Sequence, residues 1–391
     1  MHSLSEKSVS YQNEVSKNHG FFSENNLVFT EVKNSVAIIK LNNPRSLNAF
    51  TPIMLQTLIC TLEQWYLNPH IQIIIIDKMP NPLGAKPFFG VGGDVKFFYN
   101  LATVGDNACV ARAHAFFKLV NQLMLLVHNS PKTIIAINDG LVLGGALGLS
   151  IHATYRIATE NTIAGMPEIN IGFFPDVGSS YFLTHLRNGT PAIGMYLSLL
   201  GKQISTGDCM RLGLHTHCIP SSQLKTLYDE LIQQPGNVEN ILKKLSLNEY
   251  KNDTPLKLDK INLHFGKDLS SLEAIFSSLS ASSQDPWCSQ TLAKLRQLSP
   301  SSLLLTWHLL KDGEISQNFV EIISRDAKVL NLYFNSGGGL LTPDFVSGMD
   351  KLLKKKTTIQ WQQCPHKELL DFVTSEELKL PSESPSIKAR L

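Results

Sequence analysis

The chain has 391 residues, of which 43% are hydrophobic and only 17% are charged, so it can build a sizeable core and is not of the disordered class. Its length predicts one large domain with an appendage. The 35 basic and 33 acidic side chains give a net charge of +2, which is too balanced to indicate nucleic acid as a partner.

Cysteine usage and hydropathy predict a soluble intracellular protein. The six cysteines are scattered without a C-x-x-C pair or a zinc spacing, which is typical of reduced, buried thiols. No apolar stretch predicts a membrane span, and the polar N-terminus predicts no secretory signal. We expect a cytoplasmic protein in a bacterium, and a mitochondrial or peroxisomal one in a eukaryote. The peroxisomal option depends on the final residues Ala389-Arg390-Leu391.

Strand and helix patterns alternate along the first 220 residues or so. Residues 28–33 and 35–41 predict a β-hairpin, and Thr51-Pro52 predicts the start of a helix. The later predicted elements are strands at 71–76, 133–137 and 155–158 and a helix at 111–127. This alternation predicts the α/β class.

The strand signal fades in the second half. Residues 224–245 and 269–310 predict helices, with Ser299 as a cap and Pro300 in a first turn. The predicted division is a flexible N-terminal extension at 1–26, a catalytic core at 27–222, a mainly helical region at 223–380 and a flexible tail at 381–391, with a mobile loop at 335–339.

Two glycine-rich turns follow apolar strands, at 90–94 (GVGGD) and 144–146 (GGA). A glycine turn at a helix start exposes backbone N–H groups in a positive potential. Two such turns brought together could hold a developing oxyanion. Tight packing of the chain is the alternative interpretation. A dinucleotide site is a third, although neither turn fits G-x-G-x-x-G.

Two acids stand in an otherwise apolar run, Glu168 after a proline and Asp176 after Phe-Phe-Pro. Such settings desolvate a carboxylate and raise its pKa, so the pair could divide acid and base work. Alternatively, both acids cap local turns. His215 and His217 have no visible third ligand, so we expect half-buried or surface imidazoles and no metal. The chain has no G-x-S-x-G nucleophile elbow.

Four segments resemble the crotonase (enoyl-CoA hydratase/isomerase) superfamily, most strongly within residues 27–220. They are 41–49 (LNNPRSLNA), 89–94 (FGVGGD), 138–148 and 166–183 (MPEINIGFFPDVGSSYFL). The last segment is similar to the 3-hydroxyisobutyryl-CoA hydrolase branch. The resemblance implies an α/β fold with a crotonase-like ββα spiral core and a helical C-terminal region.

The resemblance also implies a site for an acyl-CoA thioester. It places the oxyanion-binding amides at Val91 and Gly145 and the catalytic carboxylates at Glu168 and Asp176. The second glutamate of a hydratase would fall at Gly148, which has no side chain, so hydrolysis is favoured over hydration. The implied substrate-binding residues are Arg45, Leu47, Asn48, Ala49, Gly92, Gly93, Asp94 and Gly144.

The expected reaction converts 3-hydroxyisobutyryl-CoA to 3-hydroxyisobutyrate and CoA, a step of valine catabolism. CoA is then part of the substrate, and no cofactor, metal, membrane or nucleic acid is expected; a homo-oligomer is possible. An enoyl-CoA hydratase or isomerase and a non-catalytic mitoribosome-associated homologue are the alternatives. The chain departs from the family pattern at Val120, where a glutamate is usual, around 324–326 and at Lys354-Lys355-Lys356.

Overall fold

The structure is a computed structural model that describes residues 21–22, 26–81, 86–104, 107–250, 252, 254–335, 343–354 and 359–361. Several predicted segments lie outside the described residues. They are most of the N-terminal extension, the loop that follows Asn335, and the tail with its Ala389-Arg390-Leu391 ending, together with Lys355, Lys356 and Cys364.

The described residues form short strands and mostly longer helices. The strands are β1 Phe21–Phe22, β2 Val28–Lys33, β3 Val36–Leu41, β4 Ile73–Lys78, β5 Phe88–Gly90, β6 Thr133–Asn138, β7 Leu141–Leu143, β8 Tyr155–Ala158, β9 Ile163–Gly165, β10 Ile204–Ser205 and β11 His217–Cys218. The helices are η1 Pro44–Ser46, α2 Pro52–Leu67, α3 Val95–Val104, α4 Asn107–His128, α5 Gly145–Ile151, η2 Glu168–Ile171, α6 Ser179–Phe182, α7 Pro191–Leu200, α8 Thr206–Leu212, η3 Ser221–Gln223, α9 Leu224–Gln233, η4 Pro235–Asn237, α10 Val238–Leu245, α11 Leu258–Phe265, α12 Leu272–Ala281, α13 Pro286–Leu295, α14 Pro300–Ile315, α15 Phe319–Asn335 and α16 Pro343–Lys354.

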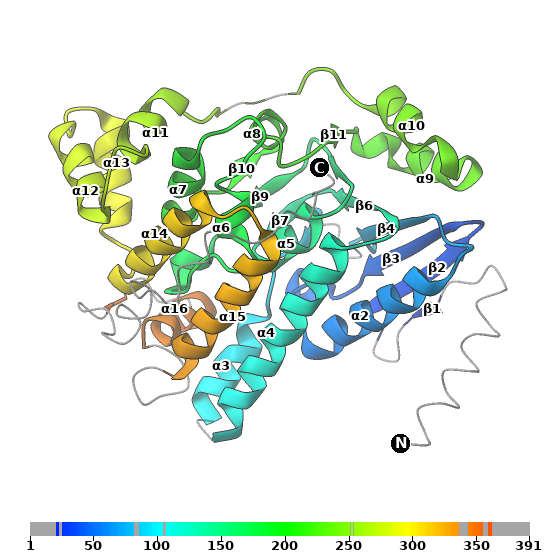
Figure 1. Ribbon diagram of the computed structural model, residues 1–391, viewed down its shortest axis with the longest axis horizontal. Coiled ribbons are helices and arrows are strands. Elements are labelled where there is room, and N and C mark those ends of the chain that lie inside the picture. The colour runs from blue at the N-terminus through cyan, green and yellow to red at the C-terminus, as the bar shows by residue number, and fades with distance from the viewer. Residues whose placement is uncertain are drawn as a thin grey trace.

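The strands make two sheets (Figure 1). The larger has the order β1-β2-β3-β4-β6-β8-β11 and the smaller β10-β9-β7-β5. Strands β4, β6 and β8 of the larger sheet are each followed in sequence by a strand of the smaller sheet, β5, β7 and β9. A helix then follows β5 and β7 before the chain returns to the larger sheet. This stacking of ββα turns confirms the predicted fold class.

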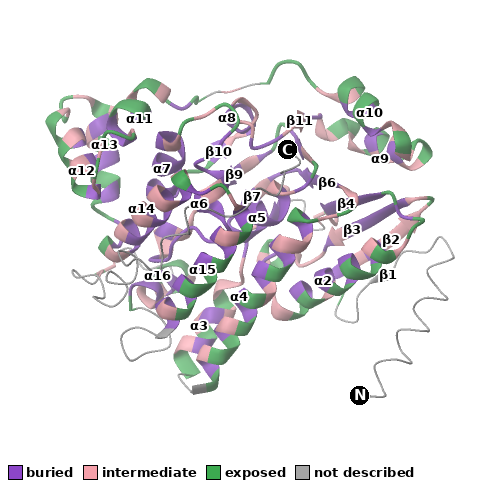
Figure 2. Cartoon of the chain, viewed as in Figure 1, coloured by how far each residue is buried: buried purple, intermediate pink, exposed green. Residues whose placement is uncertain are grey.

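Both faces of the larger sheet are covered, and each belongs to a different hydrophobic cluster. Successive side chains of a strand point to opposite faces and therefore enter different clusters. On β4, Ile74 and Ile76 join the main core, whereas Ile73 and Ile75 join a second cluster. That second cluster is completed by leucines of α9 and α10, among them Leu227 and Leu242. Figure 2 shows the buried residues concentrated in the sheets and on the inward sides of the helices.

The C-terminal helices share the main core with the N-terminal half. Helix α14 packs on α6 and α7, α15 packs on α4, and α16 packs on η2 and α3. Figure 1 shows α15 lying beside α4, with α11, α12 and α13 grouped at the upper left next to α7. The cap predicted for α14 is present, since the Ser302 amide donates to Ser299 Oγ at 3.1 Å. The last helices therefore reach the elements that carry the glycine turns and the acid pair.

Several local predictions need correction. Residues 224–245 form two helices, α9 and α10, because Pro235-Gly236 interrupts the pattern. Cys60 is exposed, whereas the other four cysteines of the described part of the chain are buried. His215 is fully buried against Asn138 instead of lying near the surface. Helix α4 is apolar and long enough to span a membrane by composition, yet it packs between α2 and α15 as a core helix does.

Candidate active site

The first glycine turn brings Val91 and Gly92 against the start of α5. Gly92 has a φ of +86°, a conformation that suits glycine. A side chain at Gly92 would place its Cβ 2.7 Å from the Gly145 nitrogen. The turn is held from the other side by Phe50, whose amide donates to the Gly92 carbonyl at 2.7 Å. The two predicted amide-bearing segments are therefore immediate neighbours.

The second glycine turn depends on a close approach between two loops. Gly140, with a φ of +98°, packs so tightly on Pro87 that any Cβ there would overlap the proline carbonyl. Gly144, with a φ of +54°, donates its amide to the Gly165 carbonyl at 2.9 Å. Helix α5 begins at Gly145, so its first amides have no partner within the helix.

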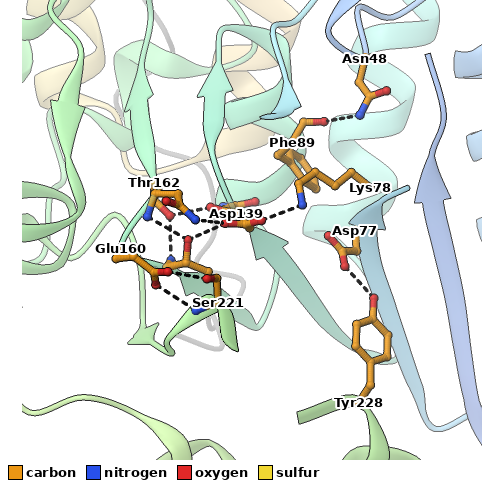
Figure 3. A network of polar contacts seen from close by, with 12 residues as sticks. Asn48, Asp77, Lys78, Phe89, Asp139, Glu160, Thr162, Ser221 and Tyr228 are labelled. Carbon is orange, nitrogen blue, oxygen red and sulfur yellow. Dashed lines mark hydrogen bonds and ion pairs between the residues drawn. The ribbon is translucent and has the colours of Figure 1, made fainter. Parts of the chain in front are cut away.

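A partly buried polar network joins the ends of strands β4 and β6 (Figure 3). Lys78, at the end of β4, donates to Asp139 Oδ2 at 2.8 Å just after β6. The other oxygen of Asp139 accepts from Thr159 Oγ1 at 2.8 Å and from Asn161 Nδ2 at 3.0 Å. The ion pair therefore joins β4 and β6, the two strands of the larger sheet that precede β5 and β7, after which the two glycine turns stand.

Glu168 lies at the first position of η2, with its carboxylate directed at the second glycine turn. A Cβ at Gly144 would overlap Glu168 Oε1 and lie 3.6 Å from the Val91 carbonyl oxygen. Oε2 is buried and accepts no hydrogen bond from the described residues. Burial raises the pKa of Glu168 well above its usual value, and the nearby charge of Asp176 raises it further. The Glu168 side chain therefore lies buried against the second glycine turn and holds its proton to a higher pH than an exposed glutamate does.

Asp176 lies on a tight turn that leads into α6. It is only 6% exposed, and its carbonyl accepts the Ser179 amide at 2.9 Å. The next residue, Val177, has a φ of +52°, a strained conformation for a β-branched side chain that costs about 1–3 kcal/mol. Burial, followed by the charge of Asp326, raises the pKa of Asp176 to about 7. Strain of this kind persists only where the surroundings hold it, and it is concentrated at functional sites.

Comparison with known proteins identifies the family of the chain. The sequence profile of the enoyl-CoA hydratase/isomerase family matches residues 36–376. The chain belongs to this family. The resemblance predicted from the sequence is therefore confirmed over most of the length.

Members of the hydrolase branch match nearly the whole chain. The mitochondrial 3-hydroxyisobutyryl-CoA hydrolase of Xenopus tropicalis is 31% identical over 87% of this chain and 84% of its own. That of Dictyostelium discoideum is 30% identical over 89% and 90%. The fold is that of a carnitinyl-CoA dehydratase from Mycobacterium thermoresistibile, with a TM-score of 0.76, 21% identity and coverage of 92% of this chain and 99% of that one.

Within this family arrangement, the predicted substrate residues separate into two groups. Gly92 and Gly144 lie at the centre of the site, as described above. Asn48 instead braces the backbone, because Oδ1 accepts the Asn43 amide at 2.7 Å and Nδ2 donates to the Phe89 carbonyl at 3.0 Å (Figure 3). On the same loop, Arg45 and Leu47 are exposed, whereas Ala49 is buried. Gly93 forms a β-bridge with Phe50, and Asp94 caps α3 by accepting the Lys96 amide.

Gly148, where the resemblance would place the second glutamate of a hydratase, has no room for a side chain. A side chain at Gly148 would place its Cβ 2.6 Å from Val177 Cγ2 and 3.2 Å from Met124 Sδ. Val177 therefore fills the space that the second glutamate would need. Among the described residues, no group of three or more His, Cys, Asp or Glu could hold a metal ion.

Sequence reasoning missed two residues next to the acid pair, Arg325 and Asp326 of α15. Asp326 Oδ2 accepts the Gly178 amide at 2.9 Å, and both side chains are almost completely buried. The signal available in the sequence was a pair of charged residues on the apolar face of an amphipathic helix.

Replacing Asp176 by Asn is expected to stabilise the fold at alkaline pH. The folded-state pKa of about 7 exceeds the ordinary value of 3.8, so the native state binds the extra proton and wild-type stability falls as the pH rises through this window. Above pH 7 the free energy of unfolding of the variant should exceed that of the wild type by up to about 4 kcal/mol, and below pH 4 the two should be equal. Urea unfolding between pH 4 and 8 measures this. The exposed control Asp259→Asn should not gain stability as the pH rises. An equal gain in both variants would contradict the raised pKa of Asp176.

Proposed function

We propose that this chain hydrolyses a short-chain acyl-CoA thioester, with 3-hydroxyisobutyryl-CoA as the substrate and 3-hydroxyisobutyrate and CoA as products. The observation that carries the proposal is the meeting of two glycine turns with one buried carboxylate, Glu168, while Gly148 and Val177 leave no room for a second hydratase acid. The names of the relatives favour the same reaction.

In the proposed reaction the Val91 and Gly145 amides donate to the thioester oxygen as it gains negative charge. Preorganised donors of this kind lower the barrier most where water is excluded. A water molecule then attacks the carbonyl carbon and gives its proton to Glu168, or Glu168 attacks first and water cleaves the resulting anhydride. In both routes the C–S bond breaks and the CoA thiolate leaves. A thiolate is a good leaving group, so the reaction needs no metal and no cofactor.

Asp176 is the second carboxylate of this mechanism. We expect it to orient the attacking water or the 3-hydroxyl of the substrate, because it lies close enough to Glu168 for their charges to interact. A buried acid pair beside a strained turn favours catalysis over a purely structural role. A mitochondrial location is the one that the names of the relatives favour.

Thiol release tests the function directly. A panel of short branched and 3-hydroxy acyl-CoAs should yield free CoA, with 3-hydroxyisobutyryl-CoA among the best substrates, and crotonyl-CoA should keep its enoyl absorbance. The rate should rise with pH as Glu168 loses its proton, and this rise should lie well above the usual range of a glutamate, because burial and the charge of Asp176 raise the pKa of Glu168. Hydration of crotonyl-CoA without thiol release would instead establish a hydratase.

A further inference from the structure

Asp326 and Arg325 of α15 form a buried charged pair behind the turn that carries Asp176. Their exposures are 1% and 2%, and Arg325 Nη2 donates to Asp326 Oδ1 at 3.0 Å. The second oxygen of Asp326 accepts the Gly178 amide at 2.9 Å. A carboxylate from a helix 148 positions further along the chain is therefore bonded to the backbone two residues after Asp176.

Arg325 anchors this pair to two further helices. Nη1 donates to Asp312 Oδ2 at 2.7 Å in α14, and Nη2 donates to Ser180 Oγ at 2.5 Å in α6. One guanidinium thus faces two carboxylates, Asp312 and Asp326, which leaves an excess negative charge beside the turn. Because Asp326 is the buried member of the two acids, its charge is the less screened by solvent.

The turn itself needs an external support. Val177 and Gly178 both have positive φ, +52° and +72°. A side chain at Gly178 would overlap the ring of Phe319, so α15 also packs directly on this segment. The Asp326 carboxylate supplies a charge-assisted hydrogen bond, which is stronger than a neutral one, at the point where the strained backbone would otherwise relax.

We propose that Asp326 is a positioning residue for Asp176. Its carboxylate holds the Gly178 amide, so that the strained turn keeps Asp176 facing Glu168, and its negative charge acts on Asp176 through the buried turn. The kinetic part of this proposal rests on the proposed hydrolase function, whereas its structural part does not.

The electrostatics agree with the geometry. After burial, the charge of Asp326 is the second cause that raises the pKa of Asp176 to about 7. Asp176 also interacts with Glu168, whereas Arg325 and Asp312 act on Asp326, and the imidazoles of His128 and His152 pack against Phe319. Burial raises the pKa of Asp326 itself, and Arg325 together with the Gly178 amide opposes this rise. Burial lowers the pKa of both imidazoles, so they are neutral near pH 7 and do not offset Asp326.

Asp326→Asn separates charge from shape, because an amide oxygen can still accept the Gly178 N–H. Removal of the negative charge should move the rise of kcat with pH, the acid limb of the pH profile, to lower pH. The maximal kcat should fall about tenfold or less, and KM should stay unchanged. Asp326→Glu, which keeps the charge, should keep the limb near its wild-type position. Asp312→Asn is the matched control, since it also removes a carboxylate from Arg325 but does not contact Gly178.

A titration independent of turnover separates this proposal from the hydrolase assignment. The full-length protein carrying 13C-carboxyl aspartate is titrated by NMR, with Asp176 assigned through Asp176→Asn. The Asp176 midpoint should fall in Asp326→Asn and stay in place in Asp326→Glu and Asp312→Asn. An unchanged midpoint in Asp326→Asn overturns the action of the Asp326 charge on Asp176. Asp326→Leu, which cannot accept the Gly178 amide, tests the bond: a folded variant with the wild-type kcat plateau overturns the positioning role. Absence of thiol release from every acyl-CoA by the wild type would overturn only the proposed function.

Discussion

Glu168→Gln is expected to lower kcat for thioester hydrolysis by about a thousandfold while leaving the affinity for the CoA ester nearly unchanged. Gln has the same shape but cannot take a proton from water or attack a carbonyl. The replacement also fits locally, because Oε1 lies against Gly144 and Oε2 has no hydrogen-bond donor to lose among the described residues. Thiol release measures kcat, and titration calorimetry with the CoA ester measures binding.

Glu160→Gln is the matched control for this change. Glu160 is exposed, and both of its carboxylate oxygens accept hydrogen bonds from Ser221 (Figure 3). Its replacement should leave kcat at the wild-type value. A Glu168→Gln protein that retained a substantial part of the wild-type rate would remove Glu168 from the chemistry.

Gly92→Ala is expected to lower kcat by about a hundredfold or more, because its methyl group would sit 2.7 Å from the nitrogen of Gly145. The φ of +86° adds strain that any side chain would bear. The substitution therefore both crowds one amide donor and displaces the Val91 turn that carries the other. Thiol-release kinetics together with the melting temperature separate loss of the site from loss of the fold.

Gly236→Ala provides the comparison for this glycine. A Cβ at Gly236 meets nothing within 4 Å, so the change should leave both kcat and the melting temperature near the wild-type values. If Gly92→Ala kept the wild-type rate with an intact fold, the two turns could not form a shared oxyanion site.

Local patterns predicted much of the fold. The hairpin of β2 and β3 follows from its alternating pattern and the helix start at Ser299-Pro300 from its cap, because both signals lie within a few residues of one another. Strands β7 and β9 escaped prediction since each is only three residues long and pairs with a distant segment. Their existence is decided by the stacking of the spiral and not by their own composition.

The candidate site was predictable where it depends on motifs and not where it depends on long-range contacts. The glycine turns and both acids are visible in the sequence. The closure of the Gly148 space by Val177, and the bond from Asp326 to Gly178, join residues 29 and 148 positions apart. No periodicity or spacing encodes such pairings, and the second of them arises only when α15 packs against α4 and α6.

The most direct measurement is the infrared spectrum of a 13C-carbonyl thioester of CoA bound to the Glu168→Gln protein. Donation from Val91 and Gly145 weakens the carbonyl bond, so its stretch should move to lower frequency than in water and return toward the solution value in a Gly92→Ala, Glu168→Gln double variant. A bound thioester whose stretch matches that of the free molecule would contradict an oxyanion site at this place.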